Sequence, residues 1–549
     1  MHFPEFYLLA AASCLKAVVS KPYVIADTKL TATTTEPNWF QTRPQSFQGP
    51  TATGVAPFLA LTNPAPFGRK TYTPNYPLET SEPIPGARGR NAFHSMGNLS
   101  PYHPNEHGFG VNEYPRPVGS NITQMHLLHR HGSRYPSSGE GLDKWAGNIT
   151  KAVAQGTVFT GDLTFLNEWS YPLGAEILIP RGRQELFDSG VLNYYNYGAL
   201  YNNDSKIVVR TTTQDRMLKS AENFLSGFFG LEWTENANLL AIIEEVGYNN
   251  SLFSTNVCPN AWKTFSGPFY TEPTDKWKKT YLEKRTQKLR ELSGDYNWTV
   301  RDSWNAQTLC AYETVSLGYS SFCRLFNYKE WQGFAYTNDI FFNAISGFQG
   351  PVSRAQGITW VEEFIARVTD RRWNYPAGTT AANVTLNANP ATFPLNQSLY
   401  LDFTHDNMIV AALTAFGFKQ FSQFLSPEGP PTQQQFHTSE IVPFAGRMNI
   451  EIITAPHVVN PRRSHDPLSD PYIRGTGETE YVHFLLNQRT VPLHRSFEKC
   501  EVRDDGWCEL ETFLEIQSRS LEKAEFEYSC RGDWELGKYG DVDDGVPME

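Results

Sequence analysis

The residue types best suited to phosphate chemistry stand together in one segment, RHGSRYP at residues 130–136. Arginine presents a planar fork of N–H donors that matches the oxygens of a phosphate group. His131 lies between Arg130 and Arg134, and like charge should lower its pKa, so that the ring stays neutral and nucleophilic. The segment therefore predicts attack on a phosphate ester by His131, rather than a surface loop that happens to be basic.

A second candidate is the dipeptide His405-Asp406, which follows the apolar segment SLYLDF and precedes the helical run MIVAALTAFG. The N-terminus of a helix favours an anion through its free N–H groups and its dipole. A capping aspartate would explain the same dipeptide without chemistry. A second pair, His465-Asp466, has no strand before it and a proline after it, so we reject it as a site.

Arg216 is the third candidate. It follows the strand-like segment KIVVR at 206–210 and a polar turn, and a helical pattern begins beside it. This repeats the order of strand, turn and helix, so its guanidinium group is expected at the same edge of the sheet. A single arginine at a helix start is ordinarily just solvated, and its significance depends on the other two segments.

These segments need a sheet to bring them together. We predict a strand at Thr123–Leu128, and the carboxyl ends of strands in open α/β sheets are where ligands bind. Strand patterns return at 398–403, 447–454 and 481–486, whereas residues 232–382 are rich in Trp and Lys with helical periodicity. The expected fold is α/β, with a mixed, largely parallel central sheet flanked by helices and an inserted, mainly α-helical domain at about 232–382. The catalytic region would span 116–549, and the Pro-, Thr- and Gly-rich stretch 21–115 would be an extended arm on it.

The composition restricts the function classes. The chain has 549 residues, of which 40% are hydrophobic and 14% aromatic, and a formal net charge of -11. A general nucleic-acid binder is therefore unexpected. A protein of this charge that attracts phosphate must concentrate its positive groups in a pocket.

The N-terminus resembles a secretory signal at 1–20. Phe6 to Val19 is mostly apolar, and the small side chain of Ser20 suits cleavage after it, although Lys16 interrupts the run and no Lys or Arg precedes it. No other run approaches the length of a membrane span. Eight Asn-x-Ser/Thr sequons fit a glycosylated, secreted protein, and whether it stays in the cell wall is left open. The candidate glycosylation sites are Asn98, Asn121, Asn148, Asn203, Asn249, Asn297, Asn383 and Asn396.

The cysteines agree with an oxidising compartment. Of seven, Cys14 lies in the predicted signal, and the other six contain no CxxC pair, which indicates three disulfides rather than a zinc site. Six cysteines allow fifteen pairings. The short spacings favour two pairs and leave a third: Cys310–Cys323, Cys500–Cys508 and Cys258–Cys530.

The candidate segments also resemble a known family. The RHGxRxP pattern, the segment VVRTTTQDRMLKSAENF around Arg216 and the distal His405-Asp406 are similar to the histidine acid phosphatases, branch 2 of the histidine phosphatase superfamily. Secreted fungal acid phosphatases and phytases share this likeness. It covers about Gly97 to Trp534, including LCAYETVSLGYSSFCRLFNYKEW, AQGITWVEEFIARVTD and RTVPLHRSFEKC.

The resemblance implies a phosphoglycerate-mutase-like fold and a role for each residue. His131 would attack phosphorus in line and form a phosphohistidine. Asp406 would protonate the leaving alcohol and then act as base toward water. The phosphoryl oxygens would be bound by Arg130, Arg134, Arg216 and His405. No cofactor or metal is required.

A metal site was the competing interpretation of the histidines near the first strand. His126, His129 and His131 lie close in sequence, and the two-residue period puts His129 and His131 on one face. However, Arg130 and Arg134 would repel a divalent cation, and no carboxylate lies within the motif. We expect His129 to be a packed, hydrogen-bonded neighbour.

Two departures from the family narrow the expectation. Ser120 stands where fungal phytases commonly have a cysteine, and the strand expected to carry its partner ends in Thr454-Ala455, so both halves are absent. Many phytases also have a lysine pair after a tryptophan, where this chain reads KEWQG at 329–333. Because phytate carries six phosphates, a pocket that prefers it should be strongly basic.

The sequence therefore predicts a secreted acid phosphatase that acts on small-molecule phosphate monoesters. A phytase is the alternative, and a catalytically inactive cell-surface binding protein is a remote one. All six site residues are present, which argues against an inactive protein. The sequence predicts no nucleic-acid partner and no membrane span, and it leaves the oligomeric state open.

Overall fold

The computed structural model describes residues 84–548, except Glu106, Asn203, Asp204, Pro467, Asp470, Gly475 and Thr476. The predicted signal at 1–20, residues 21–83 of the predicted arm and the sequon at Asn203 lie outside the described residues. Within the described part, no helix is both long and apolar enough to cross a membrane.

A single mixed sheet forms the centre of the fold. Its strand order is β3-β2-β4-β1-β5-β6-β7, with β8 beside β6. The strands β3, β2, β4 and β1 are parallel neighbours, whereas β5 and β6 pair antiparallel. The predicted fold class is thus confirmed. The strands are β1 (Asn121–Arg130), β2 (Ile207–Thr212), β3 (Ala237–Ile242), β4 (Leu399–Thr404), β5 (Arg447–Ala455), β6 (Thr479–Leu486), β7 (Arg489–Thr490) and β8 (Cys508–Glu509).

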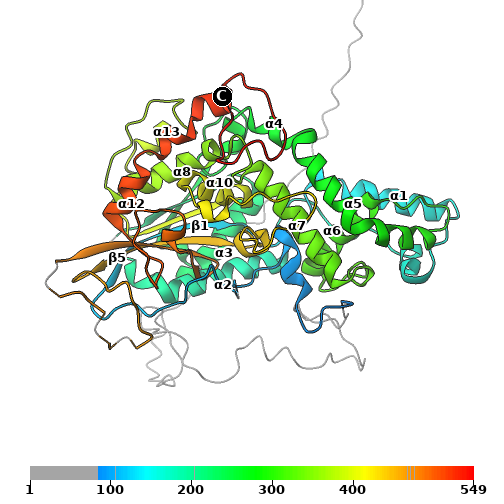
Figure 1. Cartoon of the computed structure of the whole chain (residues 1–549), viewed down its shortest axis with the longest axis horizontal. Helices are drawn as coiled ribbons and strands as arrows, with labels where there is room; N and C mark the ends of the chain where they lie inside the picture. Colours follow the sequence, from blue (N-terminus) through cyan, green and yellow to red (C-terminus); the bar gives the residue numbers. More distant parts are fainter. Residues whose placement is uncertain are drawn as a thin grey trace, which may run out of the picture. The chain divides into compact units, whose positions relative to one another are not determined.

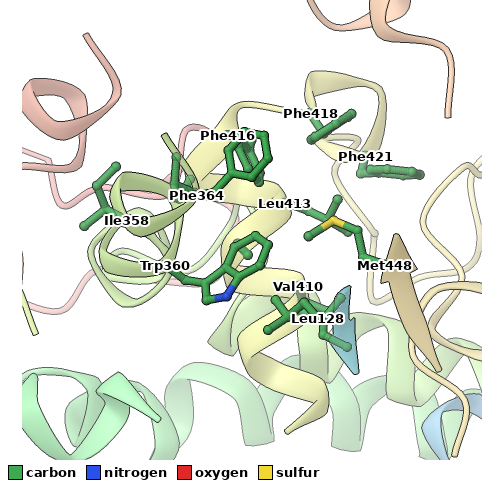
Figure 2. Packing of buried hydrophobic residues seen from close by; sticks show 14 of the residues in the cluster. Leu128, Ile358, Trp360, Phe364, Val410, Leu413, Phe416, Phe418, Phe421 and Met448 are labelled. Atoms are coloured by element: carbon green, nitrogen blue, oxygen red, sulfur yellow. The ribbon is translucent and has the colours of Figure 1, made fainter. Parts of the chain in front are cut away.

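Helices cover both faces of this sheet (Figure 1). Along β1, Met125 and Leu127 belong to the apolar cluster formed with α2 (Pro180–Tyr197) and α3 (Asp215–Phe229). Leu128 points the other way and joins the cluster of α8 (Ser353–Val368) and α10 (Asp406–Phe416). Figure 2 shows Leu128 among side chains of these two helices, together with Met448 of β5. The alternation of a strand thus anchors β1 in two separate cores.

A second group of helices lies to one side of the sheet (Figure 1). It contains α1 (Leu142–Ala154), α5 (Pro268–Glu291), α6 (Val300–Leu317) and α7 (Tyr328–Ile345), which share an aromatic-rich core that includes Trp298 and Trp331. The remaining helices are short: α4 (Ala261–Phe265), α9 (Val384–Asn387), α11 (Thr438–Ile441), α12 (Leu510–Gln517), α13 (Ser520–Ala524) and α14 (Phe526–Arg531).

The block expected to be a helical insertion, 232–382, has different limits in the structure. It begins with β3, a strand of the central sheet, and it includes α8, which covers that sheet. In contrast, α1 precedes the block in sequence and packs with its helices. The edge strand β3 was not predicted, because ANLLAI contains no aromatic residue and a single β-branched one. In the structure only Ala237 and Ile242 of this strand are buried.

The three predicted disulfides are present: Cys258–Cys530, Cys310–Cys323 and Cys500–Cys508. The described end of the predicted arm, residues 84–115, packs on the catalytic body. It includes the short 3-10 helices η4 (Ala92–Ser95) and η5 (Gly97–Leu99), and Met96 is fully buried. This part of the segment therefore packs against the body through buried side chains.

Candidate active site

Two adjacent parallel strands bring the first two candidate segments together. β1 pairs with β4 in a register that places Arg130 opposite Thr404. The chain leaves β1 directly into His131 and leaves β4 directly into His405, the N-cap of α10. Residues separated by more than half the chain thus meet at the carboxyl edge of the sheet, where open α/β sheets bind ligands.

The turn after β1 is held by close backbone packing. A Cβ atom on Gly132 would lie 2.3 Å from the carbonyl oxygen of Gly182 in α2, so this position requires glycine. The amide and hydroxyl groups of Ser133 donate to the carboxylate of Glu185 at 2.8 and 2.9 Å. The Gly and Ser of the motif therefore fix the loop to α2, and the basic residues are left to face the site.

His131 is oriented for nucleophilic attack. Its ring is buried, and Nδ1 lies 2.9 Å from the carbonyl oxygen of Gly132. A carbonyl oxygen only accepts hydrogen bonds, so Nδ1 carries the proton and Nε2 holds the free electron pair. Burial lowers the pKa of His131 well below its usual range, and the charges of three surrounding arginines lower it further. Burial is the larger cause, where the sequence had indicated like charge alone.

Arg130 joins the two halves of the site. It is fully buried, and its Nη2 lies 2.6 Å from Oδ2 of Asp406. Its Nη1 donates to the backbone carbonyls of Asn98 and Val442. These contacts lock the guanidinium group, so one side of it stays directed at Asp406.

Asp406 is the first residue of α10 and also accepts a hydrogen bond from Nδ2 of Asn98 at 3.0 Å. Burial alone would raise the pKa of Asp406, but the charge of Arg130 and the Asn98 hydrogen bond outweigh it and lower the pKa. The carboxyl group is therefore ionised in the free protein at neutral pH.

Arg134 and Arg216 complete the positive site. Nη1 of Arg134 donates to the hydroxyl of Tyr312 at 3.2 Å, and Nη1 of Arg216 donates to Glu176 at 2.8 Å. The Nε atoms of both arginines are buried without a hydrogen-bond partner among the described residues. Buried donors without a partner are costly, and a bound phosphate would satisfy them.

His405 is held by a carboxylate on the neighbouring part of the sheet. Its Nε2 lies 2.9 Å from Oε2 of Glu244, which follows β3. Burial would raise the pKa of Glu244, but His405 and other neighbours outweigh it and lower the pKa. The ionised carboxylate only accepts, so it fixes a proton on Nε2 of His405 and leaves Nδ1 as the ring's second polar atom.

These side chains line one cavity of about 710 Å³, which is bounded by the sheet edge on one side and by α4, α5, α6 and α7 on the other. His131, Arg134, Arg216, His405 and Asp406 all face it. Arg130 is connected to these residues through its ion pair with Asp406, and its charge acts on His131.

The structure thus brings together all six residues singled out from the sequence. Three supporting residues were missed. Glu244 stands at the end of the strand β3, which was not recognised, and Asn98 lies in the stretch interpreted as an arm. Tyr312 carried no signal, because an aromatic residue in a helix is ordinarily part of a core.

The rejected and secondary histidines lie elsewhere. His129 is buried and hydrogen-bonded through both ring nitrogens, to the Arg130 carbonyl at 2.6 Å and to Ser189 at 2.7 Å, as expected of a packed neighbour. His465 is exposed and stacks on Tyr114, outside the cavity.

Comparison with known proteins identifies the family. The sequence profile of the histidine phosphatase superfamily (branch 2) matches residues 121–487 of this chain. The chain belongs to this branch of the superfamily. The predicted membership is confirmed, and with it the class of enzyme, a phosphoric monoester hydrolase of the histidine acid phosphatase family.

Curated relatives of this chain include phytases and an acid phosphatase. The chain is 30% identical over 438 residues to Phytase A of Aspergillus fumigatus, a match that covers 77% of this chain and 87% of the relative. It is 29% identical over 438 residues to an acid phosphatase of Schizosaccharomyces pombe, which covers 76% of this chain and 85% of the relative.

Solved structures show the same fold. The phytase from D. castellii superposes with a TM-score of 0.64 at 20% identity, covering 84% of this chain and 93% of that one. A multiple inositol polyphosphate phosphatase of Bifidobacterium longum, solved in complex with inositol hexasulfate, gives a TM-score of 0.53 at 12% identity, covering 78% of this chain and 97% of that one.

Proposed function

We propose that this protein is a secreted acid phosphatase that hydrolyses phosphate monoesters through a phosphohistidine on His131. The observation that carries the proposal is the state of His131: its Nδ1 is committed to a backbone carbonyl, and its Nε2 is unprotonated beside three arginines. A neutral imidazole in a positive, buried pocket is a nucleophile poised for a phosphate dianion.

The reaction has two steps. In the first, Nε2 of His131 forms a bond to phosphorus, the ester P–O bond breaks, and Asp406 gives its proton to the leaving oxygen. In the second, Asp406 takes a proton from water, the water oxygen bonds to phosphorus, and the P–N bond breaks to release inorganic phosphate. Arg134, Arg216 and His405 would hold the phosphoryl oxygens throughout.

The acid role of Asp406 requires a change of charge on binding. In the free protein it is ionised and paired with Arg130. A bound phosphate dianion would compete for Arg130 and repel the carboxylate, and both effects raise the pKa of Asp406. Protonation at acid pH thus becomes favourable only when substrate is present, while the low pKa of His131 keeps the nucleophile neutral.

The nucleophile is tested by His131→Ala, with the exposed His465→Ala as the matched control. We expect His131→Ala to lose at least about 10³-fold in kcat for p-nitrophenyl phosphate and to take up no label from a ³²P-phosphate ester. Near wild-type turnover of this variant would refute the assignment. His465→Ala should retain full activity and labelling.

Phytate is the alternative substrate. The relatives named Phytase A favour it, whereas the absent lysine pair at 329–333 does not. Comparison of kcat/KM for phytate and for simple phosphomonoesters decides between them. An inactive binding protein is disfavoured because the six residues of the site all lie in contact distance of one cavity or its ion pair.

Secretion is proposed from the signal-like sequence at 1–20, the disulfides and the sequons. Among the candidate asparagines that the structure describes, four are exposed: Asn121, Asn148, Asn297 and Asn396. Asn98 is different, because the Nδ2 that would carry a glycan donates to Asp406 inside the site. Peptide mass spectrometry of the secreted protein should therefore find Asn98 unmodified in active enzyme.

A further inference from the structure

The wall of the active-site cavity that faces the catalytic residues is largely aromatic. Four helices contribute to it: α4, α5, α6 and α7. The aromatic residues that matter here are Trp262, Phe265, Tyr270, Trp304, Phe341 and Phe342. A leaving group attached to a phosphate bound at His131 would extend toward these rings, because the opposite side is closed by the sheet edge.

Several of the rings on this wall pack against one another. Trp304 packs on Phe334 with 4.5 Å between ring centroids, and Tyr270 meets Phe341 edge-on at 5.1 Å. Trp262 remains 48% exposed, so much of its indole surface is free to contact a ligand. Exposed aromatic area of this kind at a cavity rim is a binding surface for another apolar or aromatic group.

Positive charge is scarce beyond the phosphate site. Among the described residues that line the cavity, Lys278 is the one lysine or arginine besides Arg134 and Arg216. Its ammonium group donates to Asp275 at 3.0 Å and lies 4.8 Å from the ring centroid of Trp304. Lys278 is therefore already engaged, and little free charge remains for further phosphate groups.

We propose that this cavity selects phosphate monoesters with an aromatic or similarly apolar leaving group and disfavours polyphosphorylated polyols. The inference rests on the proposed phosphatase activity and names its substrate class. The aromatic wall would contact the leaving group equally before and during bond breaking, so the preference should appear mainly in KM.

Two alkyl esters test the preference without a difference in leaving-group chemistry. 2-Phenylethyl phosphate and ethyl phosphate both release a simple primary alcohol, and they differ in the aromatic ring. We expect kcat/KM to be about tenfold or more higher for 2-phenylethyl phosphate, and phytate to be a poorer substrate than it.

Variants at the rim locate the effect. Trp262→Ala should lose most of the preference for 2-phenylethyl phosphate through a higher KM, and its kcat/KM for ethyl phosphate should fall much less. Tyr195→Ala is the matched control, since Tyr195 is also 48% exposed but lies on α2, outside this cavity. Trp262→Lys should raise kcat/KM for phytate relative to 2-phenylethyl phosphate.

The outcomes separate the two proposals. Equal efficiency with both alkyl esters, or a wild-type preference for phytate, overturns the inference and leaves the phosphatase proposal standing. A preference that survives in both Trp262 variants also overturns it. Absence of hydrolysis with all three esters would instead overturn the proposed function itself.

Discussion

Asp406 must hold a proton when the ester bond breaks, yet in the free protein it is an ionised partner of Arg130. Both states of Asp406 are explained if the bound substrate replaces the carboxylate as the negative partner of Arg130. A dianion that takes over Arg130 removes the main stabilisation of the carboxylate, and proton uptake follows. Binding and protonation are thereby linked at one residue.

Sulfate binding tests this linkage. Sulfate stays a dianion across the acid and neutral range, so a pH dependence of its affinity belongs to the protein. Because the pKa of Asp406 is low when free and raised when an anion is bound, sulfate should bind more tightly as pH falls, by at most about tenfold per pH unit. Calorimetric titration of Asp406→Asn should show this dependence lost. If the pH dependence of sulfate affinity persists in this variant, a group other than Asp406 takes up the proton.

Asn98 is a positioning residue for Asp406 in this arrangement. Its Nδ2 donates to the carboxylate, and its carbonyl accepts from Arg130. Asn98→Ala should lower kcat by about 10- to 150-fold, because loss of one charge-assisted hydrogen bond costs about 1.5–3 kcal/mol. It should also move the pH range over which sulfate affinity changes to higher pH, because the hydrogen bond that lowers the pKa of Asp406 is gone.

The control for that variant is Asn396→Ala, an exposed sequon asparagine outside the cavity. Its kcat and its sulfate profile should match the wild type. An unchanged sulfate profile in Asn98→Ala, with kcat lowered, would mean that Asn98 acts on folding rather than on Asp406.

At the scale of elements, β4 is the strand that positions His405 and Asp406, and a buried charge network holds it. Asp402 of β4 accepts hydrogen bonds from Arg210 of β2 at 2.7 Å and from Arg367 and Trp360 of α8 at 2.7 and 2.8 Å. The carboxylate thus joins two strands and the helix that covers them. Burial would raise the pKa of Asp402, but the two arginines outweigh it and lower the pKa.

Asp402→Asn should destabilise the whole fold, because Arg367 loses its buried counter-charge and Arg210 keeps only its ion pair with Glu363. Breaking a buried ion pair from one side costs about 3–5 kcal/mol. Urea denaturation measures the free energy of unfolding directly, and the exposed Asp466→Asn serves as control. A loss below about 1 kcal/mol would show that the network contributes little to the position of β4.

For the whole molecule, the acid pH that protonates Asp406 for catalysis should also lower the free energy of unfolding. His126, His129 and His131 are buried and have lowered pKa values, the pKa of His129 falling to about 3, mainly through burial. Each stays neutral in the folded protein while its unfolded counterpart gains a proton below its ordinary pKa. Their contribution to stability is intact above about pH 6.5 and is lost progressively as pH falls toward their folded pKa values.

The free energy of unfolding should therefore fall between neutral pH and about pH 4.5, by about 3 kcal/mol from His129 alone. Asp402, whose pKa is lowered, also loses its contribution as pH falls, but only below its ordinary pKa, so it does not affect the difference in this range. Urea titrations at the two pH values check the difference, with inorganic phosphate expected to restore part of the stability. Equal stability at both would contradict the assignment of buried neutral histidines.

The sequence by itself determined which residues are the candidates for the chemistry of the site. The RHGSRYP segment, Arg216 and His405-Asp406 were recognisable because nucleophilic attack on phosphate needs those residue types, and strand-like segments indicated β1, β2, β4, β5 and β6. The pairing of the disulfides followed from spacing. Patterns of this kind depend on residues that are close together in the sequence, so they can be identified without the fold.

Only the tertiary structure decided how the site is completed. The Asn98 contact with Asp406 and the Glu244 contact with His405 join residues far apart in the chain, and no local pattern encodes such pairs. The same holds for the aromatic wall, because α4, α5, α6 and α7 each contribute rings that in sequence resemble an ordinary helix core. Substrate selection depends on which faces of these helices meet across the cavity, and that is set by packing rather than by periodicity.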